Sequence, residues 1–282
     1  MSETLPQPER DWSELFPDQD YRFSMGLKQG DPAKFFSPSH EYQAAIAERR
    51  QWLASGAERY AALFTDGIPL LAETRSLAQK WHTLPEFLPP QDDDPAAAWD
   101  NLMALGRNWE TDFLLLKIEG YQVPKLVGGC VCFPSSWNLE EKMGRRIDFI
   151  HEAVPGLNAS MGRSIGTFLN KLRPDVAWLR ANWGLAATGE RNLHPARGMA
   201  RLRGPLTLDE VWLRIEDQAL VALPGNDGVL FGIRLTTHPL RSVVQNPIAK
   251  QGLSRALRTM PLEMIEYKGL SAARESLITM VA

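Results

Sequence analysis

The feature that most constrains the fold is a long hairpin predicted at residues 211–238. The segment VWLRIEDQALVALPGNDGVLFGIRLTTH contains two runs of alternating apolar and polar residues on either side of PGNDG. Such alternation is typical of half-buried strands, and a Gly/Asn/Asp-rich segment between two of them is typical of a turn. If Leu223 pairs with Val229 across a five-residue loop, Gln218 faces Arg234. We therefore expect one apolar face and one face that carries a polar cluster.

A second hairpin is predicted upstream. The runs FLLLKIEG (113–120) and KLVGGCVCF (125–133) are short, apolar and placed on either side of the turn-like segment GYQVP. Gly128 and Gly129 lie inside the second run, which indicates a bulge or the close approach of another group.

Helical periodicity accounts for most of the remaining chain. Residues 1–40, rich in Pro, Asp and Ser, predict an irregular segment, and the Pro- and Asp-rich residues 84–95 predict an exposed connection. The last 44 residues predict helices with breaks near Pro247 and Pro261. Helices are also expected at 41–54, 69–81, 96–112, 138–151 and 159–172. Helices mixed with hairpins, without alternating strand–helix units, predict an α+β fold with an antiparallel sheet.

Composition excludes several functional classes. A formal net charge of −3 argues against a broad electrostatic contact with nucleic acid or anionic lipid. The two cysteines, Cys130 and Cys132, are too few for a four-cysteine iron–sulfur cluster, and their spacing in an extended run disfavours a disulfide. We expect buried, reduced thiols. No apolar signal region is visible near the N-terminus and no run approaches the ~18 apolar residues of a membrane span, so we expect a soluble cytoplasmic protein with no membrane partner.

Five segments stand in a fixed order along the chain: YRFSMGL (21–27), WETDFLLL (109–116), CFPSSWNLEEKMGRRIDFIHEAVPGL (132–157), LRANWGL (179–185) and LRIEDQALVALPGNDGVLFGIR (213–234). In this order they resemble the heme-dependent oxidative N-demethylase family, also described as the dimethylamine monooxygenase subunit. An ordered set of motifs is more specific than any one of them. Two positions depart from the family pattern: Asp217 stands in place of an arginine, and Ala153 in place of a proline.

The resemblance implies a PAS-like antiparallel sheet core with flanking helices. It implies one domain over 1–282, with a mainly helical part (1–110), a sheet core (111–238) and C-terminal helices (239–282). It also implies an enzyme that binds heme b and uses O2 to oxidise a methyl group of a small secondary amine, releasing formaldehyde. Electrons would come from a separate flavin/iron–sulfur reductase or ferredoxin-type subunits, because this chain has no G-x-G-x-x-G loop and too few cysteines for such centres.

His151 is the residue that the resemblance identifies as the axial ligand of the heme iron. Without the resemblance, a lone histidine at this place is more typical of a helix C-terminus, where its charge suits the helix dipole. Cys132 is disfavoured as a thiolate ligand because its apolar run offers no supporting donors. The alternative histidines are His40, His82, His194 and His238, of which only His238 lies in a matching region, at the end of the polar strand face.

Five further residues are candidates for the site. Arg214 and Glu216 are candidate catalytic residues, in which the arginine would stabilise developing charge and the carboxylate would hold the amine cation. Arg234, Arg180 and Asn182 are candidate heme contacts, because a guanidinium can bind a propionate bidentately. The competing interpretation of the hairpin residues is a solvent-facing ladder of charges, and that of residues 180 and 182 is a helix end beside buried tryptophans.

Two other functions remain open from the sequence. One is a PAS-like sensor or binding protein that holds heme or another ligand without turnover, since a fold does not dictate a function. The other is a family member that has lost heme and serves as a subunit of a larger complex.

Overall fold

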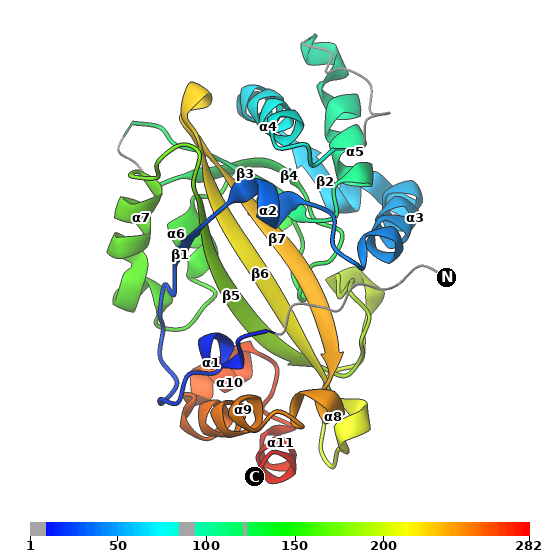
Figure 1. Cartoon of the computed structure of the whole chain (residues 1–282), viewed down its shortest axis with the longest axis vertical. Coiled ribbons are helices and arrows are strands. Elements are labelled where there is room, and N and C mark those ends of the chain that lie inside the picture. The colour runs from blue at the N-terminus through cyan, green and yellow to red at the C-terminus, as the bar shows by residue number, and fades with distance from the viewer. Residues whose placement is uncertain (1–9, 85–93, 121–122) are drawn as a thin grey trace.

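The computed structural model describes residues 10–84, 94–120 and 123–282. Its centre is a seven-stranded sheet in the order β1-β5-β6-β7-β3-β4-β2, in which each pair of neighbours is antiparallel (Figure 1). The strands are β1 (Lys28–Gly30), β2 (Ala61–Leu63), β3 (Asp112–Lys117), β4 (Lys125–Cys130), β5 (Ala177–Ala186), β6 (Trp212–Leu223) and β7 (Gly228–Pro239). The predicted α+β class with an antiparallel sheet is confirmed, while its PAS-like character stays a prediction.

The two predicted hairpins are both present. Strand β6 pairs with β7 over their full length, and β3 pairs with β4. A register shift in the second hairpin follows Leu115, and Gly129 there has a φ of +154°. A Cβ at Gly129 would lie 2.4 Å from the carbonyl oxygen of Phe113. The prediction of a bulge or close approach at these glycines is therefore confirmed.

The register of the β6–β7 hairpin differs by one residue from the prediction. Leu223 pairs with Gly228, because Asp227 takes the left-handed conformation (φ +50°, ψ +57°) and ends the turn one residue earlier. The expected pairing of Gln218 with Arg234 is wrong, and Arg234 instead faces Asp217. A shift of one residue moves a side chain to the other face of a sheet, so Arg234 lies on the face opposite to Gln218.

We call the two sides of the sheet face A and face B. Face A carries Phe113, Leu115, Val221 and Leu230, and it packs against the N-terminal helices. At the other end of the strands, Leu213 and Ile215 continue face A into a second core formed with the C-terminal helices (Figure 1). The helices that cover face A are α1 (Trp12–Leu15), α2 (Pro32–Phe36), α3 (Tyr42–Tyr60), α4 (Ile68–Lys80), α5 (Ala98–Asn108), α8 (Leu240–Val243), α9 (Pro247–Thr259), α10 (Leu262–Tyr267) and α11 (Arg274–Met280).

Face B is covered by fewer elements. It carries Leu114, Leu116, Leu220, Val229 and Phe231, which pack against α6 (Ile147–His151) and α7 (Arg163–Leu169). The helix expected at 159–172 contributes its apolar side to this core through Ile165, Phe168, Leu169 and Leu172. Further along β5 and β6, face B becomes polar.

Two predicted helices are different in the structure. Residues 138–151 contain only a 3-10 turn (Glu140–Lys142) and the short α6, because Gly144 takes a φ of +73° and Arg146 forms a bridge with Lys125. The segment LRANWGL is not a helix end but the middle of β5. The predicted connection at 84–95 lies mainly outside the residues that the structure describes, and so do residues 121 and 122 of the turn predicted at 120–124.

The other predicted helices agree with the structure to within a few residues. The expected breaks near Pro247 and Pro261 are confirmed, since each proline stands where a helix begins. Over the described ranges, no helix combines the length and the apolar character needed to cross a bilayer.

A buried ion pair joins α3 to the β3–β4 hairpin. The guanidinium of Arg49 and the carboxylate of Asp112 bind each other, and their side chains are 0% and 2% exposed. Arg49 Nε also donates to the carbonyl of Gly106 (2.8 Å), and Asp112 accepts from the backbone N–H groups of Cys132 (2.7 Å) and Phe133 (3.0 Å). Hydrogen bonds of this kind are needed to offset the cost of burying two charges.

The cysteines lie beside this ion pair. Cys130 and Cys132 are buried and free, with their sulfur atoms 3.9 Å apart, and Cys130 Sγ accepts from Arg49 Nη2 (3.4 Å). The prediction of buried, reduced thiols is confirmed.

We predict that Asp112→Asn lowers the free energy of unfolding by about 3–5 kcal/mol, because it leaves the buried Arg49 charge without its partner. Denaturant unfolding followed by circular dichroism measures this change. The matched control is Asp175→Asn, which breaks an ion pair on the surface. The side chain of Asp175 is 69% exposed and that of its partner Lys80 is 65% exposed, and such surface pairs contribute about 0–1 kcal/mol. Equal losses of unfolding free energy in the two variants would contradict the stabilising role of the buried Arg49–Asp112 ion pair.

Candidate functional site

Four of the predicted site residues meet on face B. Arg180 and Asn182 alternate on β5, and the register places Asn182 opposite Glu216 on β6. Arg214 lies two residues before Glu216 and therefore projects from the same face. The structure thus brings Arg180, Asn182, Arg214 and Glu216 together through the pairing of two strands.

The carboxylate of Glu216 is held by neutral donors. It accepts hydrogen bonds from Ser135 Oγ (2.7 Å), Gln218 Nε2 (3.0 Å) and Asn182 Nδ2 (3.4 Å). Within the described part of the chain it forms no ion pair, since no cationic nitrogen lies within 4.0 Å of it. Its oxygens are therefore fixed in direction, while its negative charge has no direct counterion.

Arg214 is a structural arginine of the same face. Its side chain is buried, and it donates to the carbonyl oxygens of Glu190 (2.7 Å) and Arg191 (2.8 Å) and to Ser135 Oγ (3.3 Å). Burial lowers the pKa of Arg214 to about 10, and the carboxylate of Glu216 opposes this shift. Arg214 thus positions Ser135, which in turn positions Glu216.

Arg180 has a guanidinium without a partner among the described residues. The Nε of Arg180 and the Nε1 of the neighbouring Trp178 are both buried, and neither makes a hydrogen bond to a described residue. Burial lowers the pKa of Arg180, and the field of Glu216 partly restores it. Two residues beyond Asn182 on the same face, a Cβ added to Gly184 would meet no atom within 4 Å. Unsatisfied buried donors and open space on the same face of a sheet are features expected of a ligand site.

His151 ends α6 on the side of the sheet where Arg180 projects. Burial lowers its pKa to about 4, and the positive charges of Arg180 and Lys142 add to this effect while Asp148 opposes it. The imidazole is therefore neutral at pH 7, which is the form that binds metals. Neither ring nitrogen bonds to another residue in the described ranges.

Arg234 lies outside this group. It belongs to face A, where it pairs with Glu110 Oε2 (2.7 Å) and donates to the carbonyl oxygens of Phe35 (2.6 Å) and Ser37 (2.7 Å). The structure thus does not bring Arg234 to the other predicted residues, because the hairpin register is one residue shorter than expected. Asp217 lies on the same face and binds Arg10 (3.0 Å), so this departure from the family pattern points away from face B.

The alternative ligands are placed elsewhere. His40 and His82 are exposed. His194 Nδ1 accepts from the backbone N–H of Ala196 (3.2 Å), and His238 Nε2 is bonded to Thr236 Oγ1 (3.2 Å). Cys132 belongs to the core around the Arg49–Asp112 ion pair.

Two residues of the site, and one lysine near it, were not among the sequence candidates. Ser135 lies in the FPSSW segment, Lys142 near His151, and Lys268 just after α10. Lys268 Nζ donates to the carbonyl of Trp183 (2.7 Å) and lies 5.0 Å from the centroid of its indole ring. Burial lowers the pKa of Lys268 to about 8, opposed by Glu216 and reinforced by Arg180. No sequence pattern distinguishes Lys268 from other lysines at helix ends, so only the structure could identify it.

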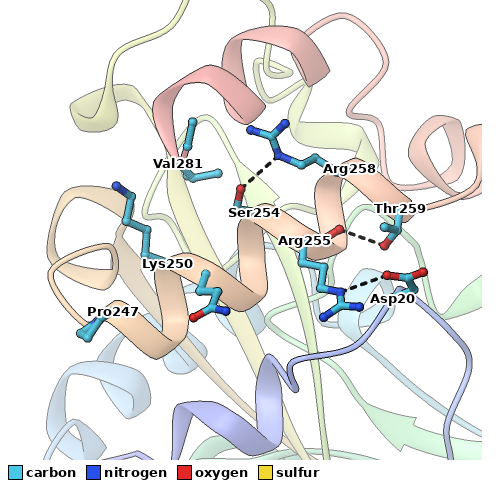
Figure 2. A pocket seen from close by; sticks show the side chains of 10 residues that line it. Asp20, Pro247, Lys250, Ser254, Arg255, Arg258, Thr259 and Val281 are labelled. Atoms are coloured by element: carbon cyan, nitrogen blue, oxygen red, sulfur yellow. Dashed lines mark hydrogen bonds and ion pairs between the residues drawn. The ribbon is translucent and has the colours of Figure 1, made fainter.

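A surface pocket of about 490 Å³ lies on a different part of the molecule, between α9, Asp20 and the C-terminal residues (Figure 2). Arg255 in this pocket pairs with Asp18 (2.8 Å) and Asp20 (3.0 Å), and Arg258 Nε donates to Ser254 Oγ (3.3 Å). The charge of Arg255 is therefore compensated, while Arg258 bonds to a neutral hydroxyl. The pocket contains none of the residues predicted for the site.

In the described ranges, no group of three or more His, Cys, Asp or Glu side chains could hold a metal ion. A heme iron has a different requirement, because the porphyrin supplies four ligands and the protein as few as one. The neutral imidazole of His151 is of the type that such a ligand requires.

One comparison identifies relatives of the chain. The model of a family described as "HODM_asu-like: Haem-dependent oxidative N-demethylase, alpha subunit-like" matches residues 26–278. This match includes both strands that form the polar part of face B, as well as α6 and Lys268.

The two arginines provide a test of the site. We predict that Arg234→Met lowers the free energy of unfolding by about 3 kcal/mol, because Glu110 loses its partner in a nearly buried ion pair. Arg180→Met should leave the free energy of unfolding unchanged or raise it, because Arg180 loses no bond to a described residue. Urea unfolding of both variants measures the difference. A loss in Arg180→Met as large as that in Arg234→Met would show that Arg180 is structural.

Proposed function

The chain belongs to the haem-dependent oxidative N-demethylase, alpha subunit-like family, and we propose that it binds heme through His151 and oxidatively demethylates a small secondary amine. The observation that carries this proposal is that three groups without an ion-pair partner in the described ranges lie on one side of the sheet. They are the neutral imidazole of His151, the guanidinium of Arg180 and the carboxylate of Glu216. We also propose that this sheet and its helices form a PAS-like core.

The residues fit a heme. A ferrous or ferric heme iron takes a neutral imidazole nitrogen, and both nitrogens of His151 are free of other described residues. The unsatisfied Nε of Arg180 and the open space over Gly184 lie on the same face, where a flat cofactor with carboxylate groups would be accommodated. His151 would hold the heme iron and Arg180 would bind a propionate of heme b, with Asn182 beside it.

The bound heme would supply the activation of O2 that oxidises the methyl group, with release of formaldehyde. The chain itself binds and orients the substrate. A secondary amine is protonated near pH 7, and the carboxylate of Glu216, which lacks a direct counterion, is suited to bind its ammonium group. Ser135, Gln218 and Asn182 fix both carboxylate oxygens, so the amine would be bound in one direction.

Glu216 can also accept a proton from the bound amine. A general base needs to lie within hydrogen-bond distance of the proton it takes, and a carboxylate that binds an ammonium group satisfies this condition. Arg214 contributes by holding Ser135 against Glu216 rather than by touching the amine. We therefore retain Glu216 as the catalytic candidate and assign Arg214 as a positioning residue.

Electron supply would come from other proteins. The chain has two cysteines, both buried beside Arg49, which are too few for an iron–sulfur cluster. The family description names an alpha subunit. We propose that a separate flavin/iron–sulfur reductase or ferredoxin-type subunit delivers the electrons.

We predict that the purified protein binds added hemin with a Soret absorption band, and that His151→Ala weakens this binding and shifts the band, because the iron loses its protein ligand. An absorbance titration with hemin measures both effects. The matched control is His40→Ala, which removes an exposed imidazole and should leave the spectrum unchanged. Failure of the wild-type chain to bind hemin would refute the proposed function.

We predict that Glu216→Gln weakens the binding of dimethylamine to the heme-loaded protein by roughly 10- to 100-fold, because the charge-assisted bond to the ammonium group is lost. The shift of the Soret band during titration with dimethylamine reports this affinity. Glutamine keeps the size of the side chain, so hemin affinity should be preserved.

Formaldehyde release separates an enzyme from a binding protein. With dimethylamine, O2, NADH and a ferredoxin–reductase pair, the wild-type protein should release formaldehyde, and Glu216→Gln should lose most of this activity. A protein that binds hemin and dimethylamine but releases no formaldehyde would be a ligand-binding protein without turnover.

A further inference from the structure

Trp178 and Arg180 are neighbours on face B of β5. The register pairs Trp178 with Leu220 and Arg180 with Gln218. Both partners belong to face B, since Leu220 packs into its apolar core and Gln218 donates to Glu216. Side chains two residues apart on a strand project from the same face about 6.5 Å apart. The indole and the guanidinium therefore stand side by side.

Each of these two side chains carries a buried donor that is not used. The Nε1 of Trp178 and the Nε of Arg180 have no hydrogen-bond partner in the described ranges. An indole N–H and a guanidinium can only donate, so neither group can satisfy the other. What both lack is an acceptor, and buried donors of this kind are ordinarily paired.

Packing explains the ring of Trp178 but not its nitrogen. The ring of Phe168 on α7 contacts the indole at right angles, with the centroids 5.4 Å apart and an angle of 88° between the planes. A phenylalanine at position 178 could make an aromatic contact of this kind without burying a polar atom. The buried indole of Trp109 differs, because its Nε1 donates to Thr83 Oγ1 (3.2 Å) inside the protein.

We infer that Trp178 and Arg180 form a two-donor site for one carboxylate, a propionate of heme, in which the indole N–H binds one oxygen and the guanidinium the other. A carboxylate has two acceptor oxygens and no donor, which matches two donors without an acceptor. Arg180 supplies the charge for this bond, and the neutral indole adds a direction. The inference rests on the proposed function, since it takes heme as the ligand. It adds Trp178 to the cofactor site and gives α7 the role of orienting that donor.

The test compares hemin with hemin dimethyl ester, in which both carboxylates are blocked. Trp178→Phe keeps an aromatic ring against Phe168 and removes only the N–H donor. It should weaken hemin binding by roughly tenfold, the loss of one hydrogen bond to a charged group, and weaken binding of the uncharged ester by less than about threefold. Absorbance titrations give both affinities.

A double variant tests whether the two donors share one carboxylate. If they do, Trp178→Phe combined with Arg180→Met should lose less affinity for hemin than the product of the two single losses, because the second donor contributes little once the first has released the propionate. The matched control is Trp109→Phe, which removes a buried indole N–H whose acceptor lies inside the protein. It should lower stability and leave the affinity for hemin unchanged.

Three results would overturn the inference. They are equal hemin affinity in Trp178→Phe and the wild type, an equal loss for hemin and its dimethyl ester, and independent losses in the double variant. In each of these cases the wild type still binds hemin, so the proposed function survives. A wild type that binds neither compound would instead refute the proposed function, and the inference with it.

Discussion

The pairing of β6 with β7 and β5 is the constraint on which the site depends. Each strand projects alternate residues to opposite faces, so the register decides which polar groups meet. Asn182 on β5 pairs with Glu216 on β6, so both lie on face B. The pairing of Leu223 with Gly228 places Arg234 opposite Asp217, and both lie on face A. The backbone hydrogen bonds of three long strands hold this arrangement in place.

The two faces of the sheet differ in whether their charged side chains form ion pairs. On face A and at the start of β3, charged side chains are paired: Arg234 with Glu110, and Arg49 with Asp112. On face B, Arg180 and Glu216 lie near each other without forming an ion pair in the described ranges, and Arg180 keeps an unsatisfied donor. Charges and polar groups held apart in this way cost stability, and they are typical of places where a ligand supplies the missing partners.

Sequence reasoning predicted more of the fold than of the site. Alternation identified both hairpins, and helical periodicity identified α3, α4, α9 and the C-terminal breaks, because these patterns report burial directly. The register failed by one residue because it depended on the left-handed conformation of Asp227, which no pattern of hydrophobicity reports. That error assigned Arg234 to the site. The segment LRANWGL was interpreted as a helix end, although its placement of Arg180 and Asn182 on one face requires a strand. Lys268 was missed because its approach to β5 depends on tertiary packing alone.

The turn between β6 and β7 has a consequence for how the length of this hairpin can vary. Successive residues of a strand project to opposite faces, and a shift of the register by one residue exchanges these faces. A chain with one residue more or fewer around Pro224–Asn226 would keep Arg234 beside Glu110 only if the turn absorbed the change, because a shifted β7 would carry Arg234 to face B. The hairpin therefore tolerates a change of length in its loop but not in its register.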